Sequence, residues 1–144
     1  MSPQNAKSAL ESFIPNHNRS QIVRKKDLHI TLDAYNANPT SMQAALASFS
    51  KKEGKKIAVL GQMNELGKHT ETEHKLLVDW IKTSSIDDCY WVGSAFAHFV
   101  SPDKYFSTVD QAMDYFSKTP LGQASLLVKG SRSFTLEKLV DVFH

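Results

Sequence analysis

Short apolar runs alternate with longer amphipathic segments along most of this chain. Apolar runs of three to six residues, bounded by charged, glycine or turn residues, predict strands, and apolar spacings of three and four predict helices. The expected strands are 21–24, 28–32, 56–61, 89–92, 104–106 and 125–129. Helices are expected at 5–13, 43–49, 95–100, 108–118, from residue 70, and after 130 through 143. This alternation predicts a doubly wound α/β domain.

The two earliest strands have a different connection from the others. Lys25, Lys26 and Asp27 alone separate them, which predicts a hairpin and therefore a mixed edge of the sheet. The run 56–61 is almost continuously apolar, as expected for a strand covered on both faces.

The helix predicted from Thr70 has the sequence of a capping box, because Glu73 follows three residues later. Its expected inward stripe is Leu76, Leu77, Trp80 and Ile81. His69 and His74 are five residues apart, so they do not share one helical face. We expect surface histidines there, not metal ligands.

Composition narrows the class of protein. The chain has 144 residues, 41% hydrophobic and 22% charged, which predicts one globular domain. A net charge of +2 without a long basic run disfavours a nucleic-acid binder, and no apolar run approaches a membrane span. The N-terminus lacks the pattern of a signal peptide, and the single cysteine, Cys89, lies in a predicted buried strand. We therefore expect a cytoplasmic protein with an inert thiol.

Polar side chains crowd the stretch Asp33–Met42, between a predicted strand and a predicted helix. Loops at the carboxyl ends of strands are where open α/β sheets bind ligands, and helix N-termini attract anions. The same residue types also form ordinary turns and helix caps. The residues of this stretch leave both interpretations open.

A second loop, Gly61–His69, superficially resembles a phosphate loop. Five residues separate its glycines where a Walker loop has four, and His69 occupies the position of the magnesium-binding hydroxyl. We therefore exclude a Walker loop. The chain also lacks a Gly-x-Gly-x-x-Gly dinucleotide fingerprint.

A third loop, Lys129–Arg132, follows the last predicted strand. Gly130 allows a close approach of backbones, Ser131 can cap a helix or bind an anion, and Arg132 can bind a carboxylate or phosphate through two hydrogen bonds. We expect this loop and the two before it to share one rim of the sheet.

Segments of all three loops, Asp33–Met42, Val59–Gly67 and Leu127–Arg132, resemble conserved segments of the bacterial Mur ligases in the same order. Phe13-Ile14-Pro15 with Arg19 is similar to the entry into that family's C-terminal domain. Within the family, the likeness is to the members that add D-alanyl-D-alanine to UDP-N-acetylmuramoyl-tripeptide in peptidoglycan synthesis.

The resemblance implies that residues 1–144 form a single Rossmann-like C-terminal domain. Its expected architecture is a mainly parallel six-stranded sheet with helices on both faces. It implies that the N-terminal domain for the UDP-sugar and the central ATPase domain, with its phosphate loop and magnesium ligands, are absent from this chain. ATP and Mg²⁺ are the implied cofactors, with the magnesium held by the missing central domain.

In such enzymes ATP converts the peptide carboxylate into an acyl phosphate, which the incoming amine attacks. The C-terminal domain orients the dipeptide and closes over ATP, so we expect this chain alone to be inactive and to hold no catalytic residue and no metal. The implied nucleotide-binding residues are Arg19, Asp33 and Asn36. The implied dipeptide-binding residues are Tyr35, Asn38, Lys129, Ser131 and Arg132.

Two positions depart from the family pattern. Gln62 stands where an aspartate is common, and Leu32 where an acidic or amide residue is common. Two alternatives remain beside the leading interpretation: another Mur-type ligase, such as a folylpolyglutamate synthase, or a non-catalytic α/β ligand-binding module.

Overall fold

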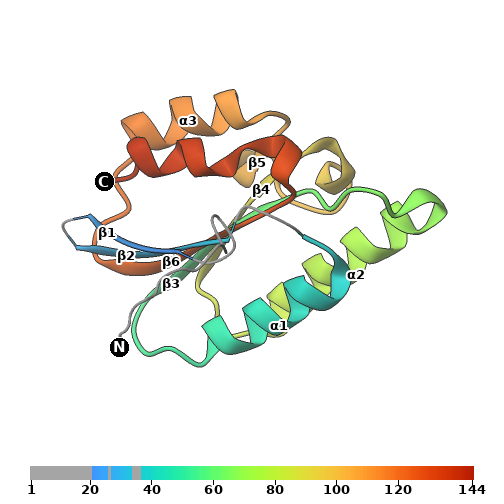
Figure 1. The fold of residues 1–144 in the computed structure, drawn as a ribbon, viewed down its shortest axis with the longest axis horizontal. Helices are drawn as coiled ribbons and strands as arrows, with labels where there is room; N and C mark the ends of the chain where they lie inside the picture. Colours follow the sequence, from blue (N-terminus) through green and yellow to red (C-terminus); the bar gives the residue numbers. More distant parts are fainter. Residues whose placement is uncertain (1–20, 26, 34–36) are drawn as a thin grey trace, which may run out of the picture.

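A single twisted sheet runs through the computed structural model, which describes residues 21–25, 27–33 and 37–144 (Figure 1). Its strands within these residues are β1 Gln21–Lys25, β2 Leu28–Asp33, β3 Lys56–Gly61, β4 Asp88–Val92, β5 Tyr105–Phe106 and β6 Ala124–Lys129. The strand order is β1-β2-β6-β3-β4-β5. β1 is antiparallel to β2, and every other pair is parallel. The hairpin, the mixed edge and the mainly parallel sheet are confirmed.

Helices cover both faces of the sheet, as predicted. α1 (Pro39–Ser50) and α2 (Thr70–Thr83) lie on one face, while α3 (Val109–Lys118) and the 3-10 segment η5 (Leu136–Asp141) lie on the other (Figure 1). Alternate residues of each buried strand point to opposite faces. In β3, Ile57 and Val59 join the α3 side, whereas Ala58 and Leu60 join the α1 and α2 side. We call these the α3 face and the α1 face.

The start of α1 differs from the prediction, which had its helix beginning at residue 43. α1 begins at Pro39, and Asn38 is its N-cap. The Asn38 Oδ1 accepts the Ser41 N–H at 2.9 Å, and the Ser41 Oγ accepts the Asn38 N–H at 3.1 Å. Proline is favoured in the first turn because that turn's N–H groups have no helical acceptor. Part of the polar stretch is therefore helix.

The predicted capping box of α2 is wrong, and its predicted inward stripe is wrong for Leu76 but confirmed for Leu77 and Ile81. His69 is the N-cap residue, and the Thr70 hydroxyl donates to the Gly67 carbonyl oxygen instead of capping. A 3-10 turn, Gly67–His69, feeds directly into the helix, so the chain is already helical before Thr70. The buried residues are His74, Leu77, Val78 and Ile81, while 55% of Leu76 is exposed.

The last predicted helix is instead two 3-10 segments, Arg132–Phe134 and η5. They are separated by Thr135, whose φ of 49° lies in the left-handed region and interrupts helical hydrogen bonding. The predicted helix at 95–100 is likewise a 3-10 turn, Ser94–Phe96. Thr108 is the N-cap of α3, because its side chain accepts the Gln111 N–H. The helix predicted at 5–13 lies outside the described residues.

Cys89 is buried in β4, as predicted, and burial raises the pKa of its thiol. No helix within the described ranges is long and apolar enough to cross a bilayer. The same residues contain no group of three or more His, Cys, Asp or Glu side chains that could hold a metal ion.

Candidate functional site

The three polar loops meet at one rim of the sheet, as predicted. β2, β6 and β3 are neighbours and run parallel, so their carboxyl ends lie together. Asp33 is the register partner of Lys129, and Lys129 is in turn opposite Leu60 at the end of β3. The topology thus brings together residues that lie 96 positions apart in the sequence.

An ion pair joins two of the predicted site residues. The Lys129 Nζ lies 3.0 Å from the Asp33 Oδ2, with side-chain exposures of 2% and 24%. An ammonium group is costly to bury without an opposite charge, so Asp33 helps to keep Lys129 in place. The Asp33 carboxylate keeps enough exposure to meet a ligand at the rim.

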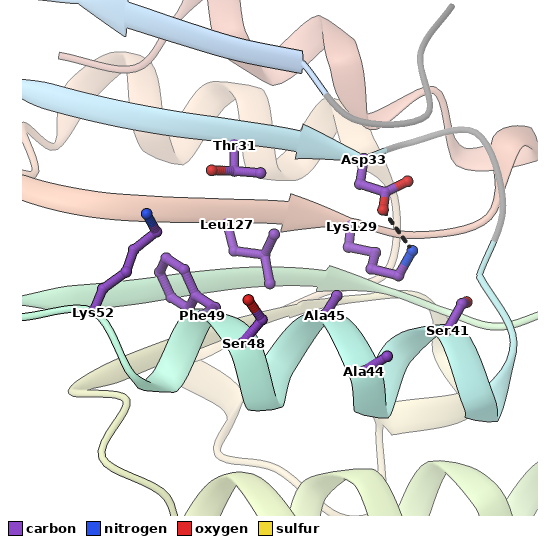
Figure 2. A pocket seen from close by; sticks show the side chains of 10 residues that line it. All are labelled: Thr31, Asp33, Ser41, Ala44, Ala45, Ser48, Phe49, Lys52, Leu127 and Lys129. Atoms are coloured by element: carbon purple, nitrogen blue, oxygen red, sulfur yellow. Dashed lines mark hydrogen bonds and ion pairs between the residues drawn. The ribbon is translucent and has the colours of Figure 1, made fainter. Parts of the chain in front are cut away.

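A hollow of about 420 Å³ opens beside this ion pair, between α1 and the sheet (Figure 2). Asp33 and Lys129 lie at its rim end, and Lys52 lies at the opposite end (Figure 2). Its sides are built largely from small or apolar side chains, namely Ser41, Ala44, Ala45, Ser48, Phe49 and Leu127. The hollow exists because α1 turns small side chains toward this part of the sheet.

Hydrogen bonds tie the second loop to the third. The Ser131 Oγ donates to the Gln62 carbonyl oxygen at 2.8 Å, and the Asn64 Nδ2 donates to the Ser133 Oγ at 2.6 Å. The Gln62 Oε1 also accepts the Ala95 N–H at 2.9 Å. Gln62 therefore stabilises the rim as a neutral acceptor.

Gly61 and Gly130 let β3 and β6 approach each other closely where they end. A Cβ on Gly130 would lie 2.9 Å from the Gly61 Cα and 2.6 Å from the Leu136 Cδ1. Contacts this short require something to move. The close backbone approach predicted for the third loop is confirmed. It brings Ser131, the residue after Gly130, within hydrogen-bonding distance of Gln62, the residue after Gly61.

His74 is fully buried, so the expectation of a surface histidine is wrong for it, although His69 is exposed. The His74 Nε2 accepts the Met63 N–H at 2.9 Å, and its Nδ1 lies 2.6 Å from the Thr70 carbonyl oxygen. Burial lowers its pKa from 6.5, against smaller raising effects of the Thr70 hydrogen bond and the Glu73 charge. The burial of His74 has one indication in the sequence: it follows Thr70 by four residues, a spacing that lets its side chain reach the Thr70 carbonyl oxygen.

The remaining predicted site residues have different surroundings. The Asn38 Oδ1 is engaged in capping α1, so the turn-and-cap interpretation holds for that atom. Ser131 is buried, and its side chain makes no capping bond to the short 3-10 segment that follows. Arg132 is exposed. Arg19, Tyr35 and Asn36 lie outside the described residues.

The model of the family described as "Mur ligase, glutamate ligase domain" matches residues 18–132. The UDP-N-acetylmuramoyl-tripeptide–D-alanyl-D-alanine ligase of Bacillus subtilis is 33% identical over 97% of this chain and 33% of its own length. The enzyme of the same name from Rickettsia prowazekii is 29% identical over 88% of this chain and 30% of its own length.

Solved structures show the same fold. A crystal structure of MurF from Acinetobacter baumannii superposes with a TM-score of 0.77 at 29% identity, covering 92% of this chain and 31% of that one. MurF from Thermotoga maritima, solved in complex with ADP, gives 0.73 at 24% identity, covering 90% and 30%. The chain thus spans about a third of the length of these relatives. Since the family match covers most of its residues, the chain belongs to the Mur ligase family, through its C-terminal glutamate ligase domain.

Proposed function

We propose that this chain is the amino-substrate domain of an ATP-dependent ligase that adds D-alanyl-D-alanine to UDP-N-acetylmuramoyl-tripeptide. The names of the relatives supply the reaction. The observation that carries the proposal is the shared rim, where the Asp33–Lys129 ion pair lies next to the bonded Ser131 and Gln62. Its acidic, basic and hydroxyl side chains can bind the two charged ends of a small zwitterion.

The proposed reaction needs two steps. The tripeptide carboxylate attacks the terminal phosphorus of ATP, giving an acyl phosphate and ADP. The dipeptide amine then attacks the acyl carbon, loses a proton and displaces inorganic phosphate. The contribution of this domain is orientation in a closed, water-poor site, which can remove a large part of the entropic barrier.

Arg132 is the proposed partner of the dipeptide carboxylate. It is exposed at the rim, and a guanidinium group binds a carboxylate through two parallel hydrogen bonds. Ser131 donates its proton to the Gln62 carbonyl oxygen, and its Oγ lies 3.4 Å from the Ser133 Oγ, so a ligand near Ser131 meets an acceptor oxygen that Ser133 shares. We therefore assign Ser131 to the ammonium end of the dipeptide. Tyr35 and Asn38 remain proposed contributors to the same pocket.

Asp33 is the proposed contact to the nucleotide, because its carboxylate can accept hydrogen bonds from ribose hydroxyls. Lys129 then acts through Asp33, since its ammonium is buried against that carboxylate. Arg19 and Asn36 stay proposed nucleotide contacts. We assign the Mg²⁺ and the phosphate loop to a central domain outside this chain, which would supply phosphoryl-transfer chemistry when it closes on the rim.

The test is an amide-ligation assay on the full-length gene product. With ATP, Mg²⁺ and UDP-N-acetylmuramoyl-tripeptide present, we expect phosphate release and a product heavier by one dipeptide residue only when D-alanyl-D-alanine is added. Glutamate transfer to a folate would instead support the folylpolyglutamate synthase alternative. The absence of turnover with either substrate pair would support a non-catalytic module, and turnover by the 144-residue chain alone would contradict the domain assignment.

A further inference from the structure

His74 is a buried titratable side chain that the proposed reaction does not use. It lies in the second turn of α2 with no exposed surface, and its ring packs edge-on against Phe96, with ring centroids 4.8 Å apart. Both ring nitrogens contact backbone groups, the Met63 N–H and the Thr70 carbonyl oxygen. A buried imidazole whose two nitrogens both bond backbone groups is held in one position and one tautomer.

The two partners determine which nitrogen carries the proton. The Met63 N–H is a donor, so the Nε2 of His74 must present its lone pair. The Thr70 carbonyl is an acceptor, so the Nδ1 must carry the hydrogen. An imidazolium would set an N–H against the Met63 N–H and break that bond. Only the neutral Nδ1–H tautomer satisfies both partners.

Few charged groups act on this imidazole. Glu73, its neighbour on α2, favours the protonated form. Phe96 of the 3-10 turn after β4 and the Met63 backbone of the β3–α2 loop are not titratable. Burial opposes protonation more strongly than Glu73 promotes it, so the pKa of His74 falls below 6.5.

Met63 lies between the two residues that tie the second loop to the third. On one side, the Gln62 carbonyl oxygen accepts the Ser131 hydroxyl, and on the other, the Asn64 amide donates to Ser133. The Gln62 N–H is held by the Val92 carbonyl oxygen at 2.9 Å. His74 supplies the next anchor of the main chain after β3 ends, and so sets where the Gln62 carbonyl points.

We propose that neutral His74 is a positioning residue for the amino-substrate site, acting through Met63 and Gln62 on Ser131. This inference rests on the proposed function, because it assigns Ser131 to the amino substrate. The imidazole touches no substrate in this scheme. It holds a loop whose carbonyl oxygen orients the Ser131 hydroxyl.

The first test needs no enzyme activity. In ¹⁵N NMR spectra of the 144-residue chain at neutral pH, we expect His74 as the Nδ1–H tautomer and the Met63 amide protected from hydrogen exchange. An Nε2–H tautomer, or an unprotected Met63 amide, overturns the proposal. Because this readout uses the free chain, it separates failure of the His74 inference from failure of the proposed ligase function.

The second test compares two substitutions in the full-length protein. His74→Gln keeps an acceptor at the ε position, whereas His74→Asn keeps only a donor near Thr70. We expect His74→Asn to raise the KM for D-alanyl-D-alanine about tenfold, as for loss of one hydrogen bond, with the KM for ATP unchanged. His74→Gln should restore most of that loss, and His69→Gln, at the exposed histidine, should have no effect.

The pH profile distinguishes positioning from simple stability. In the wild type, the dipeptide KM should rise as pH falls below 6.5 toward the lowered pKa of His74, and the Gln variant should lack this rise. The proposal would be refuted if the Asn and Gln variants lost the same amount of activity and if kcat and the KM values for both the dipeptide and ATP changed together. That result would show that His74 has a structural role only.

Discussion

The two faces of the sheet have the same architecture, helical segments over parallel strands, but differ in how completely they are filled. On the α3 face, the Phe116 ring lies 5.0 to 5.9 Å, centroid to centroid, from four other aromatic rings. On the α1 face, Ala44, Ala45 and Ser48 leave a hollow of about 420 Å³ beside Asp33. One face is therefore packed for stability, and the other leaves room where the site lies.

This difference follows from which residues the helices turn inward. α3 buries Ala112 and Phe116 against the sheet, and both pack within the core of the α3 face. α1 buries Met42, Leu46 and Phe49 but turns its small residues toward β2 and β6. A polar strand face adjoins that hollow, since Thr31 and Asp33 point into it (Figure 2). This hollow thus lies on the α1 face, where small side chains of α1 meet polar residues of β2.

The largest effect on stability is expected from Phe116→Ala on the α3 face. The side chain is fully buried among aromatic rings, so its removal should lower the free energy of unfolding by about 3–5 kcal/mol. Urea denaturation of the 144-residue chain measures this. A loss below about 1 kcal/mol would contradict the description of this face as the better packed one.

Lys129→Met should have the next largest effect, because it leaves the Asp33 carboxylate without its buried partner. Asp33 keeps 24% exposure, so we expect a loss of about 1–3 kcal/mol, measured by thermal unfolding, together with weaker nucleotide binding. Lys56→Met is the matched control, since Lys56 is also buried but bonds the carbonyl oxygens of Lys52 and Gly54. It should cost stability without changing nucleotide affinity.

The same substitution on the two faces gives the sharpest comparison. Ala112→Leu should overpack the α3 face and destabilise the domain by about 1–3 kcal/mol. Ala45→Leu should enter the hollow and change stability by less than about 0.5 kcal/mol. Calorimetry on both variants measures the difference. Equal destabilisation would mean that the hollow is not usable space.

The smallest effect on stability is expected from Arg132→Ala, because this side chain is exposed at the rim. In the full-length protein it should instead raise the KM for the dipeptide, by a loss on the order of 1–3 kcal/mol in transition-state binding. Asp33→Ala should act on the KM for ATP. If neither KM changes in the two variants, the assignment of the rim to these substrates fails.

The strands and their grouping could be predicted from the sequence because a strand buried on both faces is apolar along nearly its whole length. The run Lys56–Gly61 is almost entirely apolar, and polar residues appear where β2, β3 and β6 end. Parallel order then brings those ends together without any knowledge of contacts. The start of α1 could also be predicted, because Asn38 is a favoured N-cap residue and Pro39 is a favoured first residue of a helix.

The buried polar side chains could not be predicted, because their hydrogen-bond and ion-pair partners come from other parts of the chain and are visible only in the folded structure. The apolar side chain of Leu76 predicts an inward position, but Leu76 is exposed. The buried face of α2 instead includes His74, because backbone groups bond both of its ring nitrogens. The burial of Lys129 depends on its ion pair with Asp33, which lies 96 residues earlier in the chain. Such partners leave no periodic pattern in a sequence.

The position of β6 in the sheet has a consequence for how the chain is made. β6 is the last strand in sequence but lies third of six in the sheet, between β2 and β3. Its ladder to β2 joins residues 96 apart, as at Asp33 and Lys129. During synthesis, β2 and β3 therefore wait with unpaired inner edges until residues 124–129 emerge from the ribosome. Native pairing of the central strands is then a late and slow step of folding. Chains whose synthesis stalls before β6 expose two unpaired strand edges, which chaperones or other chains can bind.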